Sequence, residues 1–449
     1  MSVNKVVIGD VALLDISEDT AQPSDVTKGK IFHMNNGEQA IGTYENKFSN
    51  IVDNTILTID SALLGGITEL RKDAFRNDTT LTTVNLPESI RSIGNYCFKD
   101  CTNLIEITVP DSLEHIGDYA LDGCEAIEDI IYDNAVYFGN VGSNYLVLHK
   151  CTSTDITECN INPYTQFIYS EAFDGCTGLT SINLPVGLKE VGYGAFYGCT
   201  GLTSIVIPNT VKNICGYAFA LCSNITEVTI PEGIKYIGDT AFGRTKIGGV
   251  VHIPSTVEKL DGSVFRETPI TGVTFGVGSK LTVIGIACFY RCRQLQSITI
   301  PDNVTDIETK AFYQDTALET VVLGKGLKTI HSDVFMGCTN LTSVTVQEGL
   351  EDILWRGFNG CSKLTSIYIP STVKSIDSAA FSGCNSLATV IIASPIIANS
   401  IDSRIALIYY ATTIYIKTGL DISSSTYLTA NYTKQAESDK EGYDKWVIN

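Results

Sequence analysis

Cysteine and histidine carry most of the chemical potential of this sequence, because both bind metals and a thiolate is also a nucleophile. The 449-residue chain has 14 cysteines and five histidines. Cys97-x3-Cys101 and Cys288-x3-Cys292 have a metal-like spacing, but neither pair has the second half that a zinc site needs. None of the histidines (His33, His115, His149, His252 and His331) forms an H-E-x-x-H motif. We therefore expect no metal site.

Other motifs of catalysis and cofactor binding are also missing from the sequence. It contains no G-x-x-x-x-G-K-[S/T] phosphate loop and no G-x-G-x-x-G after a strand. No G-x-S-x-G lies in the strand–turn–helix context of a nucleophile elbow. These observations predict a protein that is not an enzyme and that binds no cofactor.

The cysteines are instead ordered by a repeat, since nine of them lie three residues after one recurrent phenylalanine position. That position is filled at intervals of 23 residues, with one step of 24 and one of 52, by Phe75, Phe98, Leu121, Phe173, Phe196, Phe219, Phe242, Phe265, Phe289, Phe312, Phe335, Phe358 and Phe381. The chain thus holds 13 copies of one unit. A period of 20–29 residues with apolar residues at fixed offsets is typical of leucine-rich repeats.

Each copy contains two short apolar segments, as the stretch from Ala195 to Ile214 shows. Leu202–Ile207 reads as a strand that ends at Pro208, because proline cannot donate a hydrogen bond within a sheet. Alternation places Ile205 and Ile207 on one face and Ser204 and Val206 on the other. Neither segment can bury its apolar face alone, so we expect neighbouring coils to stack into one continuous core.

The cysteine position of the repeat is predicted to be structural. Asp78, Thr245, Thr268 and Asp315 fill it in other copies, which indicates a small residue near a turn that bonds to local backbone. We expect a ladder of buried, reduced thiols. Stacked coils could also bring neighbouring cysteines within bridging distance, so disulfides between coils stay an alternative at this point.

Charge and hydropathy exclude several kinds of partner. The chain has 31 Lys and Arg against 50 Asp and Glu, a net charge of −19, whereas nucleic-acid binding needs a basic surface. No segment has the 18 apolar residues of a membrane span, and the N-terminus lacks the pattern of a signal peptide. We expect no nucleic acid, no membrane insertion, and synthesis in the cytosol, with the cell surface as the alternative location.

The repeat also predicts the domain organisation. Residues 1–50 form a small β module, with a hairpin at Lys30–Met34 and Gln39–Tyr44 joined through Asn36-Gly37. Residues 51–392 form the solenoid, whose first coil is irregular. The 52-residue step contains two apolar runs that predict a β-hairpin at 133–152 projecting from the solenoid. Two adjacent copies, at 245–249 and 268–272, lose the Cys and shift the Leu, and residues 393–449 form an α+β cap with a helix at 403–411.

The pattern L-x-x-I-x-I-P-x-x-V-x-x-I-G-x-x-A-F-x-G-C resembles the BspA-like class of leucine-rich repeats over residues 65–392. The resemblance implies a mainly β, right-handed solenoid of about 13 coils, used for adhesion or protein binding and commonly on bacterial surfaces. A shorter stretch, Asp25–Phe32 with Asn36-Gly37 and Ile41–Thr43, is similar to modules of phage and prophage tail proteins. It implies that residues 1–50 attach to virion tail proteins.

The candidate binding surface is the part of each copy that the pattern leaves free. It comprises the outward residues of the strand segment and the aromatic residues of the hairpin: Tyr137, Phe138, Tyr145, Asn183, Ser204, Val206, Glu227, Thr229, His252, Thr299, Thr345 and Tyr368. We expect a protein or glycan on a cell surface as the ligand, bound by a phage or prophage tail protein or, alternatively, by a bacterial surface adhesin.

Overall fold

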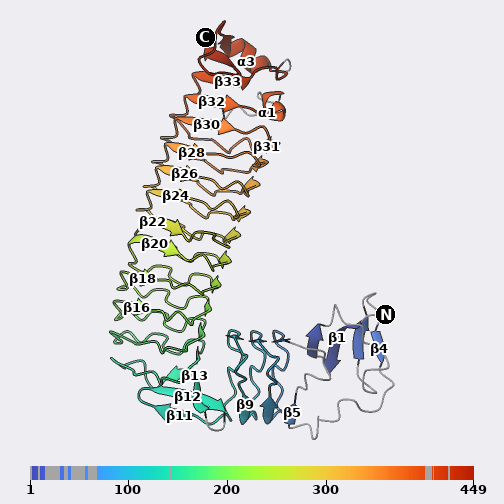
Figure 1. Ribbon diagram of the computed structural model, residues 1–449, viewed down its shortest axis with the longest axis vertical. Coiled ribbons are helices and arrows are strands. Elements are labelled where there is room, and N and C mark those ends of the chain that lie inside the picture. Colours follow the sequence, from blue (N-terminus) through green and yellow to red (C-terminus); the bar gives the residue numbers. More distant parts are fainter. Residues whose placement is uncertain are drawn as a thin grey trace. The chain divides into compact units, whose positions relative to one another are not determined.

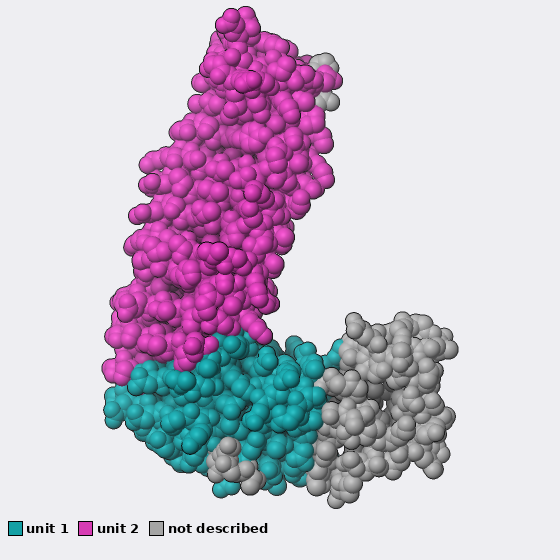
Figure 2. Space-filling view, viewed as in Figure 1, with its two compact units in different colours: residues 1–174, 182–195, 210–213 teal, residues 175–181, 196–209, 214–449 magenta. Residues whose placement is uncertain are grey.

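The computed structural model describes residues 68–140, 143–399, 407, 409–422 and 425–449, together with five short strands nearer the N-terminus. The chain divides into two compact units, which Figure 2 shows in teal and magenta. Unit 1 comprises residues 1–174, 182–195 and 210–213, and unit 2 comprises 175–181, 196–209 and 214–449. Both units are repeat solenoids of short strands, which confirms the predicted fold class.

The N-terminal strands form an antiparallel sheet in the order β2-β1-β3-β4. Their bounds are β1 (Val3–Ile8), β2 (Val11–Asp15), β3 (Ile31–Met34) and β4 (Gln39–Ile41). The predicted hairpin is confirmed by the pairing of β3 with β4, while its turn at 36–37 lies outside the described residues.

The first coils of unit 1 carry two parallel ladders, one for each half of the repeat. The strand halves are β5 (Ile56–Thr58), β7 (Thr83–Asn85) and β9 (Glu106–Thr108). The second halves are β6 (Glu69–Leu70), β8 (Ser92–Ile93) and β10 (His115–Ile116). β5 precedes Phe75, the first phenylalanine position, and it pairs in parallel with β7. The solenoid therefore has more coils than the 13 phenylalanine positions indicate.

The inserted hairpin does not project, which corrects the prediction. It consists of β12 (Ala135–Asn140) and β13 (Ser143–Cys151), and it lies in a sheet between β11 (Ile130–Tyr132) and β14 (Phe167–Ile168), with β15 (Glu190–Val191) following. Every residue from Ala135 to Phe138 is buried. A strand that is covered on both faces has a continuous apolar run instead of an alternating one, as Ala135–Phe138 does.

The hairpin changes how the coils bond to one another, although the buried core continues through Phe138, Val147 and Tyr169 as predicted. In an ordinary coil the phenylalanine N–H donates to the next coil, as that of Phe98 does to the carbonyl of Ala120. In the coil that contains Leu121, side-chain hydroxyls accept these backbone N–H groups instead. The Leu121 N–H donates to the Tyr169 hydroxyl at 2.6 Å, and the Tyr119 N–H donates to the Ser170 hydroxyl at 3.2 Å.

The coils of unit 2 stack one on the next from β16 to β33 (Figure 1). The strand halves are β16 (Ile205–Val206), β18 (Val228–Thr229), β20 (Gly249–Ile253), β22 (Ile270–Phe275), β24 (Ser297–Thr299), β26 (Thr320–Val322), β28 (Ser343–Thr345), β30 (Ser366–Ile369) and β32 (Thr389–Ile392). The second halves are β19 (Tyr236–Ile237), β21 (Lys259–Leu260), β23 (Val283–Ile284), β25 (Asp306–Ile307), β27 (Thr329–Ile330), β29 (Asp352–Ile353) and β31 (Ser375–Ile376). In sequence, β17 (Asn213–Ile214) spans the boundary between the units.

The repeated phenylalanine forms the centre of the unit 2 core. From Phe196 to Phe381 each ring stacks on the next, with centroids 5.2 to 5.7 Å apart and planes within 12° of parallel. The residues two before and two after the ring adopt left-handed backbone, as Tyr217 (φ 58°) and Leu221 (φ 60°) do around Phe219. This geometry favours glycine, which explains the Gly of the F-x-G-C pattern.

The cysteine ladder holds adjacent coils together through hydrogen bonds. In unit 2 the thiol of Cys222 donates to the carbonyl of Phe196 in the preceding coil at 2.9 Å, and that of Cys384 donates to Phe358 at 3.2 Å. All 14 cysteines are free thiols, so the prediction of reduced cysteines is confirmed and the alternative of disulfides is not. Burial raises the pKa of the Cys292 and Cys338 thiols well above the ordinary value.

The C-terminal residues close the end of unit 2. β33 (Thr413–Lys417) pairs in parallel with β32, and β35 (Tyr443–Ile448) and β34 (Tyr432–Lys434) then add antiparallel strands. Two short helices, α1 (Pro395–Asn399) and α3 (Thr426–Asn431), complete this α+β segment. The predicted helix at 403–411 falls largely outside the described residues.

Candidate functional site

The strand halves of unit 2 present the outward surface that the sequence predicts. Strand alternation turns Ile and Val inward and exposes the residues on either side of them. Of the predicted site residues in this unit, Tyr368 is half-buried and the others are exposed: Ser204, Val206, Glu227, Thr229, His252, Thr299 and Thr345. Asn183, which belongs to unit 1, is exposed as well.

The aromatic residues of the hairpin do not belong to such a surface. Tyr137 is completely buried and Phe138 is 5% exposed, so neither ring can contact a ligand. The Tyr137 hydroxyl accepts the backbone N–H of Asn162 at 3.2 Å, and burial raises the pKa of this phenol above its ordinary value. Tyr145 is half-buried and packs edge-on against Tyr137 with 5.6 Å between the ring centroids. Tyr137 and Phe138 therefore belong to the core of unit 1, and Tyr145 packs against that core.

A hollow of about 640 Å³ lies on the strand surface beside β22 and β24. Its wall includes the exposed hydroxyls of Thr274, Ser297 and Thr299. Residues Gly276, Gly278 and Ser279 line one side, and Pro301, Asp302 and Asn303 belong to the next coil. The hollow therefore offers hydroxyl, amide and carboxylate groups to a ligand.

A longer loop produces this hollow. Leu281 follows Val273 by eight positions, whereas the equivalent Val211 follows Ile205 by six, and the difference contributes to the 24-residue step in the repeat. Gly276 replaces the usual proline, and a Cβ atom there would lie only 2.5 Å from the backbone nitrogen of Ser255. The irregular spacing was the available signal for this site, but the sequence prediction did not use it to select Asp302 or Asn303.

The polar groups of the surface are arranged for hydrogen bonding. Nδ1 of His252 on β20 lies 3.0 Å from Oγ1 of Thr274 on β22, and the two residues are direct partners in the parallel register. Asp302 accepts from the backbone N–H of Lys325 at 3.2 Å and pairs with its Nζ at 3.2 Å, which lowers the pKa of this carboxyl.

The His252–Thr274 pair does not have the surroundings of a catalytic pair. A hydroxyl nucleophile needs a base that a third group orients. Within the described part of the chain, no carboxylate forms a hydrogen bond with the ring of His252, and both residues are exposed.

Among the described residues, no helix has the length and apolar character needed to cross a membrane.

Comparisons with known proteins agree with this architecture. A family model described as BspA type leucine rich repeat region (6 copies) matches residues 33–144, 148–271 and 262–388. Among solved structures, a leucine-rich repeat protein from Bacteroides ovatus is 24% identical, with 82% of this chain and 93% of that chain covered and a TM-score of 0.44. A leucine rich cell surface protein from Faecalibacterium prausnitzii is 22% identical, with 81% and 93% covered and a TM-score of 0.33. The pneumococcal vaccine antigen PcpA is 16% identical, with 83% and 84% covered and a TM-score of 0.35.

A comparison with curated proteins found no match. The family model, however, spans nearly the whole repeat region, and the stacked phenylalanines and the cysteine ladder are the structural expression of its pattern. This chain belongs to the family of BspA type leucine-rich repeat proteins.

Proposed function

We propose that this protein is a non-enzymatic recognition protein that binds a protein or glycan ligand on the outward strand surface of unit 2. The observation that carries the proposal is the hollow at β22 and β24, where the exposed hydroxyls of Thr274, Ser297 and Thr299 lie beside Asp302 and Asn303. Ligand sites combine a concave shape with a few placed polar groups, and this hollow has both.

The exposed apolar residues of the same surface support a macromolecular ligand. Val206 on β16 is 77% exposed and Val250 on β20 is 65% exposed, and one strand half, β18, lies between them in the stack. Apolar residues repeated along a solenoid face provide contact area over several coils, as the extended surfaces of repeat proteins do. Adhesion to a cell surface is the role that this arrangement fits best.

The proposal can be tested by binding the purified protein to a panel of bacterial and mammalian cells. Thr274→Lys and Thr299→Lys each place a long cation in the hollow, and we expect at least about a tenfold loss of binding. Thr339→Lys is the matched control, because Thr339 is exposed on a turn outside the hollow. Equal binding by all three variants would refute the strand surface as the site.

Attachment to a phage or prophage tail through residues 1–50 is the finer form of the proposal. Only the similarity of residues 25–43 to tail modules supports it. Deleting residues 1–50 should abolish incorporation into virions if the chain is a tail protein. For a bacterial adhesin, protease treatment of intact producing cells should instead release the chain.

A further inference from the structure

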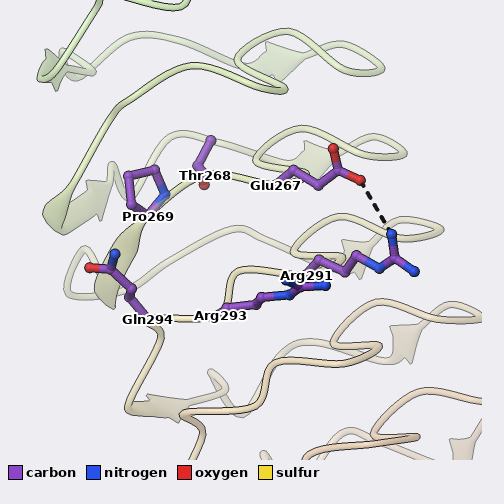
Figure 3. A pocket seen from close by; sticks show the side chains of 6 residues that line it. All are labelled: Glu267, Thr268, Pro269, Arg291, Arg293 and Gln294. Atoms are coloured by element: carbon purple, nitrogen blue, oxygen red, sulfur yellow. Dashed lines mark ion pairs between the residues drawn. The ribbon is translucent and has the colours of Figure 1, made fainter.

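The irregular coil that contains Thr268 and the coil that follows it form a notch at the turns that precede their strand halves. In a regular coil the buried leucine follows the cysteine position by three residues, as Leu295 follows Cys292. Ile270 follows Thr268 by only two, so the turn between them is shorter. The turn of the next coil, Arg293-Gln294, lies beside the position where a regular coil would have one more residue. The result is a hollow of about 430 Å³ lined by Glu267, Thr268, Pro269, Arg291, Arg293 and Gln294 (Figure 3).

Guanidinium groups surround this notch in excess of carboxylates. The Glu267 carboxylate lies 3.0 Å from Nε of Arg244, 3.6 Å from Nη2 of Arg266 and 3.9 Å from Nη1 of Arg291. Figure 3 shows the last of these ion pairs beside Arg293. Three cations thus share one anion, and Arg293 adds a fourth. This local positive charge stands out in a chain whose net charge is −19.

The charged residues of the notch occupy backbone positions that disfavour them. Arg244, Glu267 and Arg291 have φ angles of 59°, 57° and 57°. Other coils place at this position either glycine, as Gly198 and Gly337, or another side chain with the same backbone, as Leu221 and Gln314. Side chains other than glycine are strained in left-handed backbone. Three successive coils have a charged side chain at this position despite the strained backbone.

Arg293 is the cation that is free to bind a ligand. Its side chain is exposed, and among the described residues it has no hydrogen-bond or ion-pair partner. The side chain of Gln294 next to it is also exposed and offers both a donor and an acceptor. The Thr268 hydroxyl turns inward and donates to the carbonyl of Phe265 at 2.7 Å, which leaves Pro269 as an apolar part of the lining.

We propose that this notch binds a carboxylate side chain of an acidic peptide segment in a partner protein, with Arg293 as the principal contact. Guanidinium groups pair with carboxylates through two parallel hydrogen bonds, and Glu267 shows that an acidic side chain fits among these arginines. A peptide also suits the amide of Gln294 and the apolar ring of Pro269. The notch lies on the turns and not on the strand surface, so the inference does not depend on the function proposed above.

An acidic polysaccharide is less well matched to the surroundings. Sugar rings pack on open aromatic faces, and the nearest aromatic ring, that of Tyr290, is already covered. The Arg266 and Arg291 guanidiniums lie 4.8 and 5.0 Å from its centroid, and Tyr313 stacks on it at 5.1 Å. The rings therefore hold the arginines in place and do not provide a platform for a sugar.

Fluorescence anisotropy with a labelled hexaglutamate peptide tests the proposal on the full chain. We expect saturable binding that weakens as salt is added, and no binding of labelled hexaglutamine. Arg293→Gln should weaken the hexaglutamate complex by about tenfold or more, and Arg293→Glu should abolish it. Lys363→Gln, which removes one exposed cation from a turn three coils away, should leave the affinity unchanged. Thermal unfolding of each variant verifies the fold.

Several outcomes would overturn the inference. Absence of hexaglutamate binding at about 1 mM would exclude a peptide site of useful affinity. Equal affinity of wild type and Arg293→Gln, or an equal loss in Lys363→Gln, would show that the notch is not the site. Tighter binding of oligogalacturonate or inorganic phosphate than of hexaglutamate would assign the notch to another class of anion.

Discussion

The buried carboxylate of Glu190 accepts the backbone N–H of Ile116 at 3.0 Å, across 74 residues of sequence. Ile116 lies in β10, the last strand of the β6-β8-β10 ladder, so its N–H faces the place where a further coil would pair. Asn140 acts in the same way on the other half of that coil, where its side-chain amide exchanges two hydrogen bonds of 2.6 and 2.7 Å with the backbone of Val109. Side chains thus replace the missing strand at this edge.

Removing the Glu190 carboxylate should destabilise unit 1. Glu190→Ala leaves the Ile116 N–H without its acceptor and also breaks contacts with His115 (2.6 Å) and with the Asn213 amide (3.0 Å). A buried donor without a partner costs about 1–3 kcal/mol, and we expect a total loss of about 2–4 kcal/mol in the free energy of unfolding. Glu190→Gln keeps an acceptor oxygen and should lose less. Unchanged hydrogen-exchange protection of the Ile116 amide in Glu190→Ala would contradict this role.

The His115–Glu190 pair should make the stability of unit 1 depend on pH. Burial alone would lower the pKa of His115, but the Glu190 carboxylate outweighs it and the pKa is raised. The folded chain therefore holds a proton that the unfolded chain releases above about pH 6.5. Stability is fully present below that value and falls as pH rises through the folded pKa. His115→Gln should flatten the pH profile of chemical denaturation between pH 6 and 8, whereas an unaltered profile would show that another group titrates.

Each phenylalanine of the stacked ladder should be indispensable to its own coil. Phe219 is completely buried between Phe196 and Phe242, with ring centroids 5.3 and 5.6 Å away. Phe219→Ala should cost about 3–5 kcal/mol. Val206→Ala is the control, because this exposed side chain should change stability by less than about 0.5 kcal/mol. Urea unfolding followed by circular dichroism measures both, and a loss below about 1 kcal/mol for Phe219→Ala would show that the ring contributes little.

Asp315 interrupts the cysteine ladder, and replacing it with cysteine should stabilise the folded chain. It fills the cysteine position of its coil, it is completely buried, and within the described residues neither carboxylate oxygen has a hydrogen-bond partner. Burial raises the pKa of this carboxyl well above the ordinary value. The folded chain then holds a proton that the unfolded chain has released above about pH 4, so stability falls as pH rises from that point.

Asp315→Cys should remove this pH dependence and restore the thiol that the adjacent copies carry at Cys292 and Cys338. We expect a gain of about 1–3 kcal/mol near neutral pH, measured as the free energy of unfolding in urea. Asp315→Asn is the matched comparison, because it abolishes titration without restoring the thiol. A pH profile that stays the same in both variants would show that Asp315 does not titrate on unfolding.

The sequence by itself determined the repeat and the inward side of every coil. A buried ring at each repeated phenylalanine and an exposed residue at Ser204 and Thr299 follow from periodicity, because each copy repeats the same local environment. That the thiols are free was decided by the structure. The left-handed residues around Phe219 agree with the same pattern, since glycine recurs two residues after the ring.

Only the tertiary structure decided what happens where the repeat is broken. The burial of Tyr137 and Phe138 depends on the coils that cover the hairpin from both sides, and no local pattern states which faces are covered. No sequence pattern singled out Glu190, yet its carboxylate accepts a hydrogen bond from a strand edge 74 residues away in the chain. The arginine notch likewise depends on how the turn at Arg293 stands over the shortened turn at Thr268. Such contacts join distant residues, and periodicity specifies only the neighbour one coil away.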